Sequence, residues 1–348
     1  MILKHTQELI QRKLAEEAFD SYAVWVGLGE DEITLTSDNV NGDTLFDIAS
    51  CGKILHTAPL ILQAIGEGRF TLESTLDEFF ENVPEAKKKI TIHQLLTHTS
   101  GIIRIPLPKE VCAQGIDAVA AYMLAHPLAF EPGSNYTYSC NGMFLLGFIL
   151  EKLYGKTLDV LFEEKIKQPL GMTRSRFVIG IDEPNAAICY SRREPGESRF
   201  DDDNVRAMGR PGGSGGSFFT LNDVRKYVKA VMEKSDLLLP NAFYDPAEVN
   251  YTPDYAEGRG LGFLVVDDKY PQTGTLFPVG SFGHCGHTGQ SIFMNRELNL
   301  RVVVLSNATR FLRKKSNFTH YDYGVIMAMR EEIHNEIKRD LVAEGLLA

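Results

Sequence analysis

The chain has 348 residues, 44% of them hydrophobic, and a chain of this length and composition can bury a large core. Its 36 basic and 46 acidic residues give a formal net charge of −10, and basic residues gather in short runs such as those at residues 87–89 and 313–315. This balance argues against nucleic acid as a partner, and no apolar run approaches the length of a membrane span.

The first ten residues are amphipathic and charged, and they lack the apolar segment of a secretory signal. If the chain begins there naturally, we expect a cytoplasmic protein with no membrane partner. The five cysteines are an odd number, which fits free thiols in a reducing compartment.

The N-terminal part predicts a helix followed by strands. Apolar residues repeat with a helical period over residues 2–19, and two β-rich runs follow at 22–28 and 33–36, joined by an acidic turn. Asn41-Gly42-Asp43 is typical of a further turn.

The middle of the chain, from residue 66 to 165, predicts mainly helices. We expect a helix that starts at the N-cap Thr91 and stops at Gly101, and a buried helix that is ended by Gly155. The buried helix should cover residues 143–153. Two further helices are expected at 117–125 and 158–166, and a turn at 132–133. Residues 180–216 are polar, glycine-rich and too long for a simple connector, so we interpret them as a functional or covering loop.

The last third of the chain returns to strands. After a helix at 221–232, capped by Thr220, we expect strands at 261–266, 291–294 and 301–306 and a final helix at 323–341. The order predicts an α+β fold with one antiparallel sheet built from both chain ends and flanked by the terminal helices. We expect residues 1–53 and 217–348 to form this sheet region, residues 54–216 to form a large helical insertion, and the active site to lie in the cleft between them.

Ser50 and Lys53 mark a candidate catalytic turn. A short apolar run ends at Ser50 and a helical period follows, so Lys53 should lie one turn later on the same face. A lysine can activate a serine only if burial or nearby positive charge lowers the lysine pKa. The tetrapeptide alone favours the simpler interpretation, an N-cap serine with a solvated lysine. Pro59 predicts a kink in this helix.

Four later stretches strengthen the catalytic interpretation, at residues 95–101 (L-L-T-H-T-S-G), 138–147 (Y-S-C before L-L-G), 212–220 (glycine-rich) and 283–289 (G-H-C-G-H-T-G). In this order they resemble the serine β-lactamases and penicillin-binding-protein-like hydrolases, on the class C, DD-carboxypeptidase and esterase side. The resemblance spans roughly residues 20 to 310. It implies a β-lactamase/transpeptidase-like fold and no cofactor.

The resemblance also implies residue roles. Ser50 would be the acylated nucleophile, Lys53 its base partner, and Tyr138 the second proton carrier. The backbone N–H groups of Ser50 and His287 would form the oxyanion hole. His284 and Gly286 would stand on the edge strand where the family has Lys-Thr-Gly or His-x-Gly. Because a tyrosine is a poor base at neutral pH, a cation must stabilise its anion, either Lys53 or His284, and Lys53 and Tyr138 are expected to titrate together.

Three positions depart from the family pattern. Cys140 stands where β-lactamases have an asparagine, although a shifted register would use Asn141 instead. His284 replaces a lysine and Cys285 a hydroxyl residue, which weakens recognition of a substrate carboxylate. These changes favour an esterase, an amidase or a D-amino-acid peptidase over efficient penicillin hydrolysis.

Other polar residues have simpler interpretations. We expect His98 to be structural, and we expect no metal at His284 and His287, because positions i and i+3 of a strand point to opposite faces. Residues 201–203 predict a solvated loop, with a calcium site as the lesser alternative. Because Cys51, Cys140 and Cys285 all fall inside the motifs, we hypothesise that thiol reagents block the cleft.

The sequence thus predicts a serine hydrolase that cleaves an ester or amide of a small-molecule or short-peptide acyl substrate through an acyl-enzyme. Two alternatives stay open: a penicillin- or peptide-binding sensor without turnover, and a degenerate interaction scaffold. No pattern in the sequence identifies the acyl group or the leaving group of the substrate. Nor does any pattern indicate whether β-lactams are hydrolysed or only bound, or what the oligomeric state is.

Overall fold

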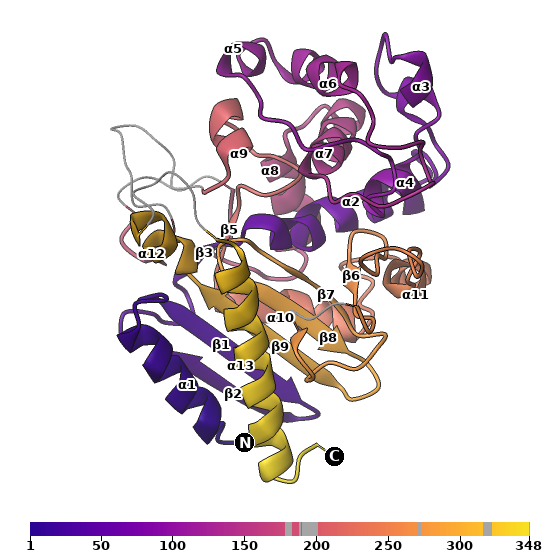
Figure 1. Cartoon of the computed structure of the whole chain (residues 1–348). Helices are drawn as coiled ribbons and strands as arrows, with labels where there is room; N and C mark the ends of the chain where they lie inside the picture. Colours follow the sequence, from indigo (N-terminus) through magenta and orange to yellow (C-terminus); the bar gives the residue numbers. More distant parts are fainter. Residues whose placement is uncertain (178–182, 188, 190–200, 270–272, 316–321, 348) are drawn as a thin grey trace.

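The computed structural model describes the chain except for residues 178–182, 188, 190–200, 270–272, 316–321 and 348. Its main sheet has six strands in the order β2-β1-β9-β8-β7-β6, and all neighbours pair antiparallel. The strands are β1 (Tyr22–Leu28), β2 (Asp31–Thr36), β6 (Leu264–Val265), β7 (Phe282–Cys285), β8 (Ser291–Asn295) and β9 (Leu300–Ser306). The predicted sheet from both chain ends is therefore confirmed (Figure 1).

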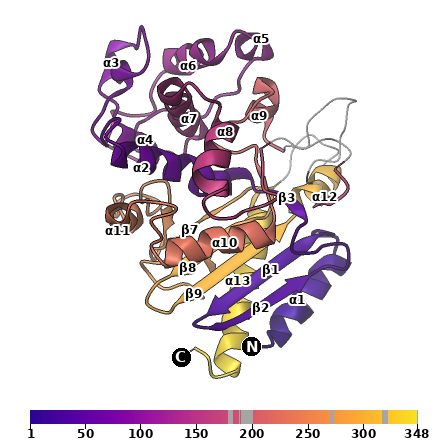
Figure 2. The ribbon, with the colours of Figure 1, turned by 180° about the vertical axis from the view of Figure 1, so that it is seen from behind.

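The two central strands β1 and β9 are buried on both faces. Trp25 and Val303 pack into the core on one face, whereas Val24 and Val304 pack into the core under the terminal helices. The helices α1 (Lys4–Ala15) and α13 (Gly324–Ala343) cover that second face side by side, and α10 (Leu221–Met232) covers the first (Figures 1 and 2). Successive side chains of these strands thus pack alternately into the cores on the two faces of the sheet, because they point to opposite faces.

The segment between the first strands and α10 is mainly helical, as predicted. Its α-helices are α2 (Ala58–Gly66), α3 (Glu85–Lys88), α4 (Ile92–Leu96), α5 (Lys109–Cys112), α6 (Ile116–Ala125), α7 (Cys140–Tyr154), α8 (Leu158–Phe162) and α9 (Asp203–Met208). The predicted buried helix is α7, which starts three residues early because Ser139 caps it by accepting from the Gly142 N–H at 3.3 Å. Gly155 ends α7 in the left-handed conformation, as expected.

Two predicted elements are shorter in the structure. Thr91 caps α4 as expected, but the helix ends at Leu96, five residues before Gly101. The strand expected at 261–266 shrinks to β6, because the Leu261 and Gly262 N–H groups donate instead to the carbonyls of Ala247 (3.0 Å) and Leu96 (3.2 Å). The strand thus loses regular pairing where neighbours from outside it take its backbone donors. The helix α4 instead ends where His98 adopts the left-handed conformation with φ 58°.

A small second sheet leads into the site. In it, β3 (Leu45–Asp47) pairs parallel with β4 (Ala186–Ala187) and antiparallel with β5 (Phe218–Phe219). The remaining described α-helices are α11 (Tyr244–Glu248) and α12 (Ala308–Lys315). Within the described part of the chain, no helix is long and apolar enough to cross a membrane. Much of the predicted covering loop at 180–216 lies outside the described residues, and the division at residues 53 and 217 stays a prediction.

Candidate active site

The turn that carries Ser50 is more irregular than the predicted helix. After β3, Ala49–Cys51 form a 3-10 turn, Lys53–Thr57 form a π-helical turn, and α2 begins only at Ala58. Ala49 is left-handed with φ 46°, a conformation that costs energy for a residue with a Cβ. The Asp47 carboxylate holds it by accepting from the Ala49 N–H at 3.0 Å. Pro59 was expected to kink a continuous helix. In the structure, Pro59 lies in the first turn of α2, and the π-helical turn comes before it.

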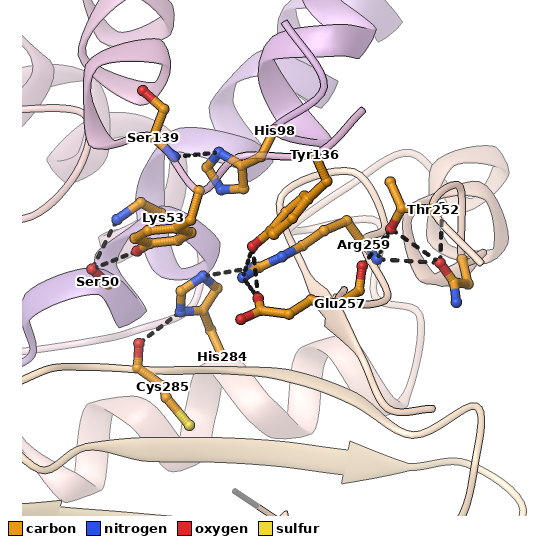
Figure 3. A network of polar contacts seen from close by, with 12 residues as sticks. Ser50, Lys53, His98, Tyr136, Ser139, Thr252, Glu257, Arg259, His284 and Cys285 are labelled. Atoms are coloured by element: carbon orange, nitrogen blue, oxygen red, sulfur yellow. Dashed lines mark hydrogen bonds and ion pairs between the residues drawn. The ribbon is translucent and has the colours of Figure 1, made fainter. Parts of the chain in front are cut away.

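The Ser50 hydroxyl lies between two proton-carrying groups. Lys53 Nζ is 2.9 Å from Ser50 Oγ, and the Tyr138 hydroxyl donates to Ser50 Oγ at 2.8 Å (Figure 3). The structure therefore brings together the three residues that the family resemblance singled out, while Ser50 itself stays partly open to solvent.

Lys53 is fully buried among neutral groups. Its Nζ lies 3.1 Å from the Ser214 carbonyl oxygen, 3.0 Å from Ser214 Oγ and 3.8 Å from Cys140 Sγ. No ion pair joins Lys53 to a carboxylate in the described part of the chain. Burial without a counter-ion lowers the pKa of the Lys53 amine, which suits it to accept a proton. Sequence reasoning missed Ser214, for which the glycine-rich segment around it was the one available signal.

Tyr138 is set to hold its proton at rest. Burial raises the pKa of its phenol well above the ordinary value. Two cations nevertheless stand against its ring, with Lys53 Nζ 5.0 Å and the Arg259 guanidinium carbon 5.2 Å from the ring centroid. Both would favour the anion whenever the proton is given away.

Arg259 is the main site residue that sequence reasoning missed. It is 3% exposed, its Nη1 lies 3.3 Å from His284 Nε2, and its Nη2 donates to the Tyr136 hydroxyl at 3.0 Å and to the Glu257 carboxylate (Figure 3). It lies in an irregular segment before β6 that has no periodic pattern. The one signal in the sequence was an acidic residue, Glu257, two positions before Arg259.

His284 is neutral in this arrangement. Its Nδ1 lies 2.7 Å from the Cys285 carbonyl oxygen, which can only accept, so Nδ1 carries the hydrogen. Burial, reinforced by the positive charge of Arg259, lowers the pKa of His284 well below the usual range. Of the two cations expected to assist Tyr138, His284 therefore does not carry charge, and Arg259 takes that place.

The end of β7 docks directly against the Ser50 turn. A Cβ on Gly286 would lie 2.6 Å from the Ile48 carbonyl oxygen, so only a glycine permits this approach. The Thr288 hydroxyl and the Gln290 amide both donate to the Asp47 carbonyl oxygen, at 2.8 and 2.7 Å. This contact places the backbone of residues 286–287 beside the nucleophile turn. The oxyanion-hole assignment of Ser50 and His287 stays a prediction.

The His287 side chain belongs to a buried acidic cluster. His287 Nε2 lies 3.1 Å from Asp201 Oδ2, and the Asp201 N–H donates to Asp47 Oδ2 at 2.8 Å. Burial raises the pKa of Asp47 to about 6. Burial alone would lower the pKa of His287, but the hydrogen bond and the charge of Asp201 outweigh it, so the pKa of His287 is raised. The predicted solvated loop is wrong for Asp201, which is 1% exposed because it closes this cluster. Asp202 instead caps α9 by accepting from the Val205 N–H at 2.9 Å.

The first residues of α7 differ in what they contact. Cys140 Sγ faces Lys53, whereas the buried Asn141 amide has no hydrogen-bond partner among the described residues. His98 is structural, as predicted, because its Nδ1 accepts from the Ser139 N–H at 3.3 Å and its carbonyl accepts from the Thr137 N–H at 3.0 Å. No group of three potential metal-binding side chains gathers within the described ranges.

The thiols of the site are poorly placed for the expected block by thiol reagents. Cys51 is 0% and Cys285 7% exposed. The Cys51 thiol donates to the His284 carbonyl oxygen at 3.5 Å, and burial raises the pKa of Cys51 well above its usual value. Since the thiolate is the reactive form, reagents should reach and modify Cys51 slowly.

Comparisons with known proteins identify relatives over most of the chain. A family model described as Beta-lactamase matches residues 6–320. The esterase EstB of Burkholderia gladioli is 28% identical over 309 residues, which cover 76% of this chain and 78% of that protein. A putative D-alanyl-D-alanine carboxypeptidase of Escherichia coli K12 is 26% identical over 301 residues, covering 76% of this chain and 69% of that protein.

A solved structure extends the likeness to the fold. The octameric penicillin-binding protein homologue from Pyrococcus abyssi superposes with a TM-score of 0.73 at 21% identity, covering 100% of this chain and 78% of that one. This match confirms the expected β-lactamase/transpeptidase-like architecture.

Proposed function

The chain belongs to the β-lactamase family, and from that premise we propose that it is a serine hydrolase that cleaves an ester or amide bond through an acyl-enzyme on Ser50. The observation that carries the proposal is the pair of contacts on Ser50 Oγ, from Lys53 Nζ at 2.9 Å and from the Tyr138 hydroxyl at 2.8 Å. A nucleophile within reach of a base, beside a second proton carrier, is the arrangement that acyl transfer needs. We place this site in the cleft between the sheet region and the helical region.

In the acylation step, Ser50 Oγ attacks the substrate carbonyl and its proton passes to the Lys53 amine. The bond from the carbonyl carbon to the leaving group breaks as Tyr138 donates its proton to that group. The proton on Lys53 then returns to the Tyr138 phenolate, which restores both groups. The pKa directions agree with these roles, because burial lowers that of Lys53 and raises that of Tyr138.

Water releases the acyl group by the reverse sequence. The Tyr138 proton first passes to the Lys53 amine, and the Tyr138 phenolate then takes a proton from the attacking water. Lys53 gives its proton to Ser50 Oγ as the acyl bond breaks, which restores all three groups. The backbone N–H groups of Ser50 and His287 would stabilise the developing oxyanion, each contributing on the order of 3 kcal/mol to the transition state. The close approach of Gly286 to Ile48 supports this assignment.

The groups around the nucleophile favour an ester or a simple amide over a substrate read through its carboxylate. Arg259 is a permanent cation, but Glu257 already occupies one end of its guanidinium, and His284 is uncharged. Cys140 offers only a weak hydrogen-bonding group beside Lys53. The esterase among the relatives fits this preference.

The test is intact-protein mass spectrometry after brief exposure to p-nitrophenyl acetate and, separately, to a penicillin, with wild type beside Ser50→Ala. We expect an acetyl adduct, or a burst of nitrophenol, that Ser50→Ala abolishes, together with weak penicillin labelling. A long-lived penicilloyl adduct would instead support a sensor without turnover, and rapid penicillin turnover a β-lactamase. An unreactive wild type would contradict the proposal and favour the scaffold alternative.

A further inference from the structure

Arg259 is held more rigidly than the proposed proton transfers alone would require. Its N–H donates to Thr252 Oγ1 at 2.8 Å and its carbonyl accepts from the Tyr251 N–H at 2.8 Å, which fixes the backbone. At the other end, Glu257 and Tyr136 bind the same guanidinium nitrogen (Figure 3). A long side chain ordered at both ends, and 3% exposed, is positioned for a specific neighbour.

The neighbour on one side is His284, and the contact fixes its tautomer. A guanidinium has donors and no acceptor, so the 3.3 Å contact between Arg259 Nη1 and His284 Nε2 requires a lone pair on Nε2. The Cys285 carbonyl oxygen requires the hydrogen on Nδ1. His284 is thereby held neutral, with the acceptor nitrogen turned toward Arg259, and cannot exchange a proton with the substrate through Nε2.

The neighbour on the other side is Tyr138. The guanidinium carbon lies 5.2 Å from the Tyr138 ring centroid, nearly the distance of Lys53 Nζ on its own side. When Lys53 accepts the Ser50 proton and Tyr138 releases its own, the phenolate stands between two cations. Only Arg259 keeps its charge throughout the cycle, because a guanidinium does not deprotonate in proteins.

We propose that Arg259 is a positioning residue of this site, a permanent cation that fixes His284 as a neutral acceptor and favours the ionised form of Tyr138 during acyl transfer. The proposal rests on the proposed function for its kinetic part and on geometry alone for its histidine part.

Among the described residues, polar and aromatic groups from several elements face Tyr138. Lys53, Ser50 and Cys140 approach from the turn and from α7, and the His98 and His284 rings lie 4.8 and 6.2 Å from the Tyr138 ring. Tyr323 adds a weaker unfavourable influence. Of these groups, the two histidines have pKa values well below the usual range, so Lys53 and Arg259 are left as the cations.

Glu257 supplies a control of opposite sign. Its carboxylate neutralises Arg259, so Arg259→Gln and Glu257→Gln should move the site's electrostatics in opposite directions. For p-nitrophenyl acetate, we expect Arg259→Gln to lower kcat about tenfold at pH 7, to change KM little, and to raise the midpoint of the pH–rate profile by about one unit. Glu257→Gln should lower that midpoint, and Arg259→Lys should restore it toward wild type.

A second measurement does not depend on turnover. In protein labelled with ¹⁵N-histidine, the His284 signal, assigned with His284→Gln, should show the neutral Nδ1–H tautomer in wild type at pH 7. Arg259→Gln should alter its Nε2 shift.

The outcomes separate the two proposals. Midpoint shifts of the same sign in Arg259→Gln and Glu257→Gln, or no shift in either, would overturn the electrostatic role of Arg259. A charged or Nε2-protonated His284 in wild type would overturn the positioning role, even if the Arg259 variants failed to fold. A wild type that Ser50-dependent chemistry never labels would refute the proposed function, yet leave the histidine result standing.

Discussion

The two sides of the candidate site treat buried charge in opposite ways. On the helix side, defined by Lys53, Cys140 and Ser214, a buried amine touches only neutral groups. On the strand side, defined by Glu257, Arg259, His284 and His287, the Arg259 guanidinium is paired with the Glu257 carboxylate, and the His287 ring lies against the Asp201 carboxylate. The first arrangement lowers the pKa of Lys53, and the second preserves a fixed charge.

The difference shows how one fold can place two cations beside one tyrosine and give them separate tasks. A buried charge without a partner is unstable and readily loses its proton, which is the property of a base. A buried guanidinium paired with Glu257 keeps its charge and can serve only as a fixed electrostatic group. Exchanging these properties between the two sides is therefore the strongest test of the comparison.

The largest effect is expected when the helix side receives a permanent charge. Arginine cannot deprotonate, so Lys53→Arg should be unable to accept the Ser50 proton and should lower kcat for p-nitrophenyl acetate by about 10³-fold. Lys87→Arg is a matched control, because Lys87 is also buried but donates to the carbonyls of Leu124 and His126, which arginine can also do. Steady-state kinetics would measure both. Near-normal kcat in Lys53→Arg would contradict the role of Lys53 as base.

A smaller effect is expected where the two sides meet. In Gly286→Ala, the new Cβ would lie 2.6 Å from the Ile48 carbonyl oxygen, so the end of β7 must move away from the Ser50 turn. A displacement of this kind commonly costs about 10²-fold in kcat. Gly324→Ala, at the start of α13, meets only the flexible Asp322 side chain and should retain activity. If Gly286→Ala kept wild-type kcat, the close contact would have no part in positioning the oxyanion donors.

The sequence predicted the regular parts of the molecule well, for a physical reason. The central strands and α7 are long, apolar and buried, so their periodicity follows from the cores that they fill. The contacts of Ser50, Lys53 and Tyr138 followed from motif spacing together with the family resemblance. In such segments local pattern and tertiary environment agree.

The missed residues come from segments that have no period to detect. Ser214, Arg259 and Asp201 lie in irregular backbone, and their partners are 161, 25 and 86 residues away in the chain. Their roles arise from tertiary contacts that no local pattern specifies. The same cause explains the error at Asp201, because an acidic run looks solvated until the fold buries one member against His287.

The smallest expected effect concerns Asp47, the buried carboxylate that accepts a hydrogen bond from the Asp201 N–H. Burial raises the pKa of Asp47 to about 6 from 3.8 in the unfolded chain. The native state therefore binds an extra proton between these values, so this contribution to stability is complete below 3.8 and is lost as the pH rises through 6. Asp47→Asn cannot bind that proton. We define the stability gap as the free energy of unfolding of wild type minus that of Asp47→Asn. This gap should be about 1.4 kcal/mol larger at pH 5 than at pH 7.5.

Urea unfolding at several pH values would measure this gap, and Asp223→Asn provides a control of opposite sign. Although burial opposes it, hydrogen bonds from the backbone N–H groups of Ser175, Thr173 and Arg174 lower the pKa of Asp223 below 3.8. Its stabilisation is present above 3.8 and is lost only as the pH falls through the folded pKa. The free energy of unfolding of wild type minus that of Asp223→Asn should therefore stay constant between pH 7.5 and 5 and decrease at lower pH. If the stability difference between wild type and Asp47→Asn also stayed constant, Asp47 would be ionised throughout this pH range, and its folded-state pKa would not be raised.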